Sequence, residues 1–142
     1  MSPSRPSRSS AGARRSNSKV VLAPADKLKR EVQAALTDEL AQDQYRSGFG
    51  RFDGFAYVAA EAYFHLAGGY DAGLQPIQLK RRSKSHWWLV DSDGRVIDLT
   101  LGARESSSFP YQRGRRRPFR HTPAGLSRRA QTIVERVRTR RG

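Results

Sequence analysis

The sequence lacks cysteine and contains no long apolar run. Without cysteine the 142-residue chain can form neither a disulfide nor a thiolate zinc site, and the default location is the cytoplasm. No stretch approaches the roughly 18 apolar residues of a transmembrane helix, and the N-terminal residues lack the apolar segment of a secretory signal. Histidine is scarce, with three in all, and none pairs with acids at metal-ligand spacing. These absences predict a protein without membrane span, metal or other cofactor.

Acidic residues are almost missing from both ends of the chain. Residues 1–22 contain five basic and no acidic residues, residues 101–142 contain twelve basic and two acidic ones, and residues 23–100 are nearly neutral, within a formal net charge of +14. Serine, arginine, proline and glycine leave the first segment little to bury, so residues 1–22 are predicted to be a disordered basic arm before a single domain, 23–142. The basic flanks indicate a polyanion partner such as nucleic acid, or charge that serves solubility alone.

The apolar pattern predicts an α+β fold with helices packed on a small antiparallel sheet. Pro24 and Thr122-Pro123 are expected in the first turns of helices, and Gly68-Gly69 should end a helix. Pro76 indicates either an edge strand or a strand start. Residues 101–121 are expected to form an irregular basic loop. The predicted helices cover about 24–45, about 55–67 and 123–140, and the predicted strands 74–80, 86–90 and 95–99.

The stretch SHWWLVDSDGRVIDLT predicts a β-hairpin with a histidine on one strand and an aspartate on the other. A loop of two or four residues would place His86 and Asp98 on opposite faces. A three-residue loop, Ser92-Asp93-Gly94, would pair Trp88 with Asp98, and its last residue is the glycine that such a loop needs in a left-handed conformation. We therefore expect the three-residue loop, in which His86 and Asp98 are diagonal neighbours on one face.

A histidine held by an aspartate has a specific chemical use. The carboxylate fixes the imidazole tautomer, and the other ring nitrogen can then take a proton from a nucleophile. The alternative is a structural histidine beside aromatic residues and an aspartate that ends a strand.

The order of these motifs resembles the core of the papain-like thiol enzymes, particularly the transglutaminase-like branch. In that core a cysteine opens a helix, a histidine lies on a following strand and an aspartate on the next; SHWW and DLT match the last two. Over about residues 50–137 the chain is also similar to small uncharacterised bacteriophage proteins with Gly-x-Cys-Tyr-Val-Ala-x-Glu-Ala at the helix. The resemblance implies acyl transfer or amide hydrolysis on a protein or peptide, in the host cytoplasm if the chain is phage-encoded. Asp98 would orient His86, which would activate a thiol at position 56.

The chain departs from this pattern at the nucleophile, because Ala56 occupies the cysteine position in GFAYVAAEA. A helix N-terminus favours a thiolate, but alanine can form no acyl-enzyme. The resemblance therefore implies a natural pseudoenzyme or an inactivated variant, with His86 and Asp98 expected to face the start of the second helix. Glu61, further along that helix, could support the site or form an ordinary salt bridge.

The basic segment RGRRRPFR suggests a second function. Guanidinium groups beside Tyr111 and Phe119 suit pairing with phosphates and stacking on bases, whereas the alternative is a solvated basic loop. The chain has no motif that recognises a particular base sequence. The hypothesis is therefore that the protein binds nucleic acid non-specifically. The residues predicted to bind are Arg113, Arg115, Arg116, Arg117, Arg120, Arg128 and Arg129.

Overall fold

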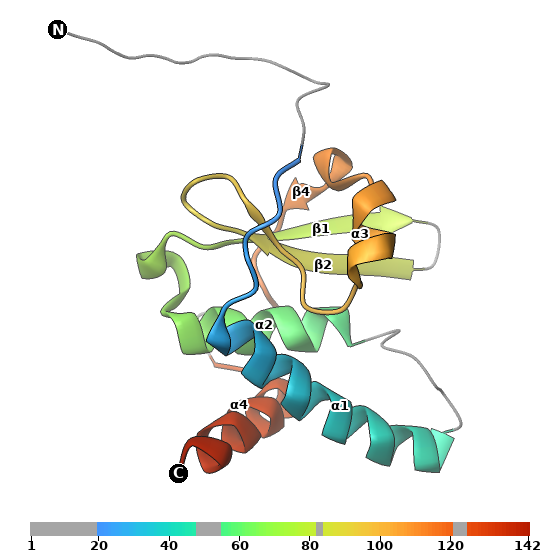
Figure 1. Ribbon diagram of the computed structural model, residues 1–142, viewed down its shortest axis with the longest axis vertical. Helices are drawn as coiled ribbons and strands as arrows, with labels where there is room; N and C mark the ends of the chain where they lie inside the picture. Colours follow the sequence, from blue (N-terminus) through green and yellow to red (C-terminus); the bar gives the residue numbers. More distant parts are fainter. Residues whose placement is uncertain (1–19, 48–54, 82–83, 121–124) are drawn as a thin grey trace, which may run out of the picture.

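Three helices pack on one side of a four-stranded antiparallel sheet, which confirms the predicted α+β class (Figure 1). The computed structural model describes residues 20–47, 55–81, 84–120 and 125–142. The helices are α1 (Lys27–Ser47), α2 (Ala56–Ala67), the short α3 (Ala103–Ser108) and α4 (Arg128–Arg141), and 3-10 turns cover Gly69–Ala72 and Tyr111–Arg113. The strands are β1 (Gln75–Arg81), β2 (Lys84–Val90), β3 (Val96–Ile97) and β4 (Arg115–Arg116).

Two helices begin later than the sequence predicts, because a capping side chain sets each start. The Asp26 carboxylate accepts the backbone N–H of Lys29 at 2.7 Å, so α1 begins at Lys27 and Pro24 lies before it. Ser127 accepts the N–H of Ala130 at 3.2 Å, so α4 begins at Arg128 rather than at position 123. The predicted cap at Thr122 and Pro123 lies outside the described residues. The predicted stop of α2 is confirmed, since Gly68 is left-handed with φ 109°.

The strand order is β3-β2-β1-β4, so β1 is a central strand. Pro76 is its second residue, which agrees with a strand start and excludes the edge position. The predicted irregular loop 101–121 instead contains α3, a 3-10 turn and the edge strand β4. Gly114 allows β4 to approach the sheet, because a Cβ at this position would lie 2.4 Å from the Trp88 ring.

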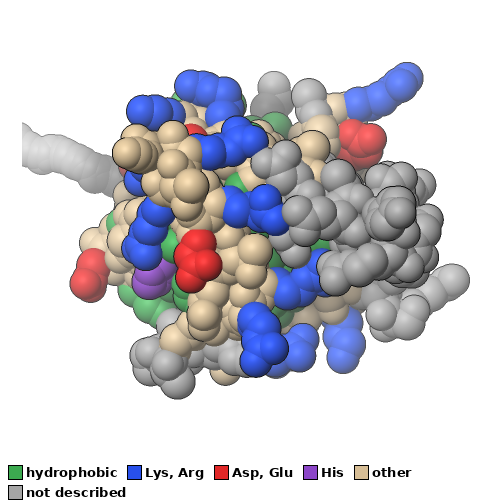
Figure 2. Space-filling view, turned by 90° about the horizontal axis from the view of Figure 1, so that it is seen from below, with side chains coloured by type: hydrophobic (Ala, Val, Ile, Leu, Met, Phe, Trp, Pro, Cys, Tyr) green, Lys and Arg blue, Asp and Glu red, His purple; other side chains and the backbone are tan. Residues whose placement is uncertain are grey.

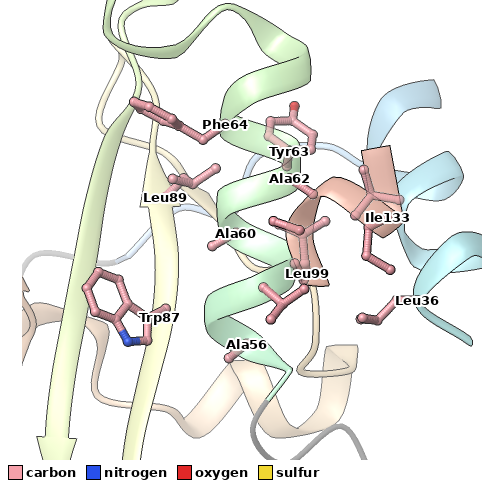
Figure 3. Close-up of a cluster of buried hydrophobic side chains, with 14 of the residues drawn as sticks. Leu36, Ala56, Ala60, Ala62, Tyr63, Phe64, Trp87, Leu89, Leu99 and Ile133 are labelled. Atoms are coloured by element: carbon pink, nitrogen blue, oxygen red, sulfur yellow. The ribbon is translucent and has the colours of Figure 1, made fainter. Parts of the chain in front are cut away.

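Two apolar clusters lie on opposite faces of the sheet. The larger one packs Trp87 and Leu89 of β2 against α1, α2 and α4, and Figure 3 shows both side chains on the side that faces α2. The alanines of α2 let this helix pack closely on several sides. The smaller cluster, on the other face, contains Trp88 and Tyr111.

Part of the predicted basic arm is ordered against β3. Leu22 forms a parallel bridge with Val96, and the Val96 N–H donates to the carbonyl of Val21 at 2.8 Å. Backbone pairing therefore extends the sheet to residues 21 and 22, at the end of the segment that the sequence assigns to the basic arm. Residues 1–19 of the arm lie outside the described part of the chain. No described helix is both long enough and apolar enough to cross a membrane.

Candidate functional site

The hairpin has the predicted three-residue loop. Leu89 pairs with Ile97, and the N–H of Asp91 donates to the carbonyl of Arg95 at 3.0 Å, which leaves residues 92–94 as the loop. Gly94 has φ 80°, the left-handed conformation that this loop type requires.

The predicted contact between His86 and Asp98 is confirmed. His86 Nε2 lies 2.7 Å from Asp98 Oδ2, and the Tyr111 hydroxyl donates to the same oxygen, also at 2.7 Å. The other oxygen, Oδ1, accepts the backbone N–H groups of Thr100 and Leu101 at 3.0 and 3.1 Å. Asp98 therefore joins β2, the end of the hairpin and the 3-10 turn at Tyr111 in one network.

The network keeps the Asp98 carboxylate ionised. Burial raises the pKa of Asp98, but the hydrogen bonds from His86, Tyr111 and the Leu101 backbone, with the charge of His86, lower it below its usual range. Burial and the adjacent carboxylate raise the pKa of Tyr111, which stays a neutral donor. Because the ionised carboxylate can only accept, His86 donates its Nε2 proton.

Aromatic rings surround the imidazole and leave its side chain 15% exposed. The ring of Trp88 stacks on it at a centroid distance of 5.6 Å, and Phe109 approaches edge-on at 4.9 Å. Tyr111 was not predicted from the sequence as a partner of Asp98. Nothing in the local pattern marks that contact, since the two residues meet through the fold of the segment after β3.

Ala56 lies on the opposite side of the sheet from this pair. It is 6% exposed and belongs to the same core cluster as Trp87, whose ring lies 4.9 Å from that of Tyr57 in the first turn of α2. Successive strand residues alternate between faces, so His86 points away from α2 when Trp87 points toward it. The expectation that His86 and Asp98 face the start of the second helix is therefore wrong. The large apolar surface of Trp87 is buried on the helix face instead.

Among the described residues, the hydrogen-bond partner of Glu61 is Ser127. The fully buried side chain accepts the Ser127 hydroxyl at 2.7 Å and the Ser127 backbone N–H at 3.4 Å. Because Ser127 also caps α4, Glu61 connects the middle of α2 to the start of α4.

Most of the candidate arginines lie in or near the edge strand β4, whereas Arg128 and Arg129 begin α4. Arg116 pairs with Ile77 of β1, so it lies on the Trp88 face, and Arg115 and Arg117 lie on the opposite face. All three are exposed, as are Arg113 and Arg128. Among the described residues none of these five arginines has an ion-pair partner.

Two further arginines rest on aromatic rings at the start of α2. The guanidinium of Arg120 lies 5.4 Å from the centre of the Tyr57 ring, and that of Arg129 lies 4.6 Å from the centre of the Phe55 ring. These contacts bring the segment after β4 and the first turn of α4 next to two nearby residues at the start of α2. We call the seven candidate residues together the arginine surface. Figure 2 shows that basic side chains are also spread over the face seen from below.

The aromatic residues predicted to stack on bases are buried. Phe119 is 1% exposed and packs against Tyr57, Phe64 and Trp87, with ring centroids 5.3 to 5.4 Å apart. Tyr111 is 5% exposed and bonded to Asp98. The stacking prediction is therefore wrong, because both rings anchor the basic segment to the core.

Comparison with protein-family models, curated proteins and solved structures finds no match to this chain. In the described part of the chain, no three acidic or histidine side chains come together where they could hold a metal ion.

Proposed function

We propose that the protein binds nucleic acid non-specifically, with the arginine surface in contact with the phosphate backbone of the nucleic acid. The observation that carries this proposal is the set of exposed arginines without ion-pair partners among the described residues: Arg113, Arg115, Arg116, Arg117 and Arg128. A guanidinium offers a planar pair of donors that matches two phosphate oxygens. Side chains on both faces of the β4 edge could contact phosphates along a polyanion that runs past it.

Charge, not base recognition, accounts for the affinity in this proposal. Tyr111 and Phe119 are buried, and the rings of Tyr57 and Phe55 are covered by Arg120 and Arg129, so these aromatic faces are not free for bases. Binding through phosphates releases counterions and falls steeply with salt. The proposal therefore includes similar affinity for different base sequences.

A papain-like or transglutaminase-like pseudoenzyme is the weaker candidate. It is supported by the 2.7 Å contact between His86 and Asp98. The position of the nucleophile is occupied by Ala56, which lies in the core on the face of the sheet opposite to the histidine–aspartate pair. The same histidine and aspartate have a structural use that needs no substrate, because they join β2 to the segment that covers the smaller cluster.

The test is fluorescence anisotropy with a labelled DNA duplex at several salt concentrations. We expect log K to fall linearly with log salt. Replacement of the arginines at 115–117 by glutamine should reduce that slope by about one for each phosphate that the variant no longer neutralises. A second duplex of unrelated sequence should bind with the same affinity and the same slope.

The matched control removes the same charge elsewhere. Lys27, Arg30 and Arg104 are exposed and lie on α1 and α3, so their replacement by glutamine changes the net charge equally. We expect the control to retain most of the binding that the 115–117 variant loses. Absence of binding at low salt, or an equal loss in both variants, would contradict the proposal.

A further inference from the structure

A cleft of about 310 Å³ lies where the N-terminal segment, α1, α2 and the hairpin loop meet. Its volume is at the lower end of the range for small-molecule sites. Ala67, Leu74 and Ile97 contribute apolar surface, and all four charged residues that line the cleft come from α1 and its cap or from the hairpin. The lining residues are Ala23, Pro24, Asp26, Lys29, Tyr63, Ala67, Ala72, Leu74, Asp91, Arg95 and Ile97.

Asp91 is already paired inside the protein. Its Oδ1 accepts the backbone N–H groups of Asp93 and Arg95, each at 2.9 Å, and its Oδ2 accepts Arg95 Nε at 3.1 Å. Burial raises the pKa of Asp91, but these bonds and the Arg95 charge lower it. The negative charge of Asp91 is therefore balanced by Arg95.

Asp26 also has protein partners for both oxygens. Oδ1 accepts the Lys29 backbone N–H at 2.7 Å, and Oδ2 accepts the Tyr63 hydroxyl at 2.8 Å. Burial and Asp26 raise the pKa of Tyr63, so its hydroxyl remains a donor to this carboxylate. Asp26 thus caps α1 and holds α2 against it.

The ammonium group of Lys29 differs from the other charges in the cleft. Lys29 is half-buried, and its side chain has no ion-pair partner among the described residues. It lies in the first turn of α1, where the helix dipole adds positive potential. Because both carboxylates of the cleft already accept hydrogen bonds on each oxygen, this ammonium is the group there that can take an anionic partner.

We propose that the cleft binds a small organic carboxylate, with its charge at Lys29 and its apolar body against Ala67, Leu74 and Ile97. Asp26 and Asp91 disfavour a multiply charged anion, so this site differs from the arginine surface in the ligand it takes. The inference does not depend on the proposed nucleic-acid binding.

The test is a titration of ¹⁵N-labelled protein with hexanoate, hexylamine and hexanol, followed by amide chemical shifts. We expect hexanoate to shift the amides of residues that line the cleft, and the amine and the alcohol to shift them much less at equal concentration. Lys29→Gln should weaken hexanoate binding about tenfold or more, the effect of losing one charge-assisted hydrogen bond. Lys27→Gln, on the same helix turn but outside the lining, should retain wild-type affinity.

A second variant keeps the inference testable if Lys29→Gln perturbs folding. Ala72 is exposed and lines the cleft, so Ala72→Leu narrows it without removing a polar contact, and should also lower hexanoate affinity. Equal shifts with hexanoate, hexylamine and hexanol would overturn the proposal. The absence of hexanoate shifts, or unchanged affinity in Lys29→Gln and Ala72→Leu, would overturn it as well.

Discussion

Removal of the Asp98 carboxylate should destabilise the protein by several kcal/mol. This side chain is 3% exposed and accepts four hydrogen bonds. Asp98→Ala removes the acceptor that the Tyr111 hydroxyl and the His86 N–H share, and each buried donor left unpaired costs about 1–3 kcal/mol. The backbone donors at Thr100 and Leu101 are half-buried and can reach water. We therefore expect a loss of about 2–6 kcal/mol, a large share of the 5–15 kcal/mol typical of a domain.

Asp98→Asn should cost less than Asp98→Ala, about 1–2 kcal/mol, because the amide oxygen can still accept the two backbone N–H groups. Urea unfolding followed by tryptophan fluorescence measures both variants, since Trp87 and Trp88 are buried and lie on opposite faces of the sheet. Asp71→Asn, at an exposed position, is the control and should change stability by less than about 0.5 kcal/mol. A loss in Asp98→Ala as small as that of the control would refute the reasoning.

The stabilisation by Asp98 should also depend on pH. The folded-state pKa of Asp98 lies below its unfolded value, so the unfolded state binds the proton more readily. Its contribution is then fully present above the unfolded pKa of about 3.9, and is lost as pH falls through the lower folded-state pKa. The difference between wild type and Asp98→Asn should therefore shrink as the pH falls below about 4. A difference that grows on acidification would contradict this sign.

Two further predictions concern positions where the tertiary structure restricts substitution. Ala56→Cys should give a thiol whose alkylation has the same pH dependence with and without His86, because the sheet separates position 56 from the histidine–aspartate pair; an alkylation midpoint that rises when His86→Ala is added would show that the histidine acts on the thiol. Gly114→Ala should lower the free energy of unfolding by about 1–3 kcal/mol in urea melts, because the new Cβ would meet Trp88 ring carbons at 2.4 and 2.5 Å. Gly102→Ala, whose Cβ would meet the flexible end of Glu105, should cost clearly less, and equal costs would argue against the clash.

The hairpin register could be derived from the sequence because its determinants are local. The position of Gly94 selects a three-residue loop, and the two-residue period of a strand then brings His86 and Asp98 to the same face. The apolar faces of α2 and α4 are also determined locally, since the three- and four-residue spacing of apolar residues identifies the buried face of a helix. The first residues of α1 and α4 were harder to predict, because several residues before each helix could have served as its cap.

The alternation of side chains along the strands does not predict which face of the sheet the helices cover. HWW offers one tryptophan to each face, and packing against α2 decided that Trp87 would be buried there and His86 turned away. The contacts of Tyr111 with Asp98 and of Glu61 with Ser127 join residues 13 and 66 positions apart, so no local pattern contains them. The sequence alone therefore determined the contact between His86 and Asp98 and the arginine-rich composition. Long-range packing decided on which face of the sheet that pair lies relative to α2, and which aromatic residues are buried.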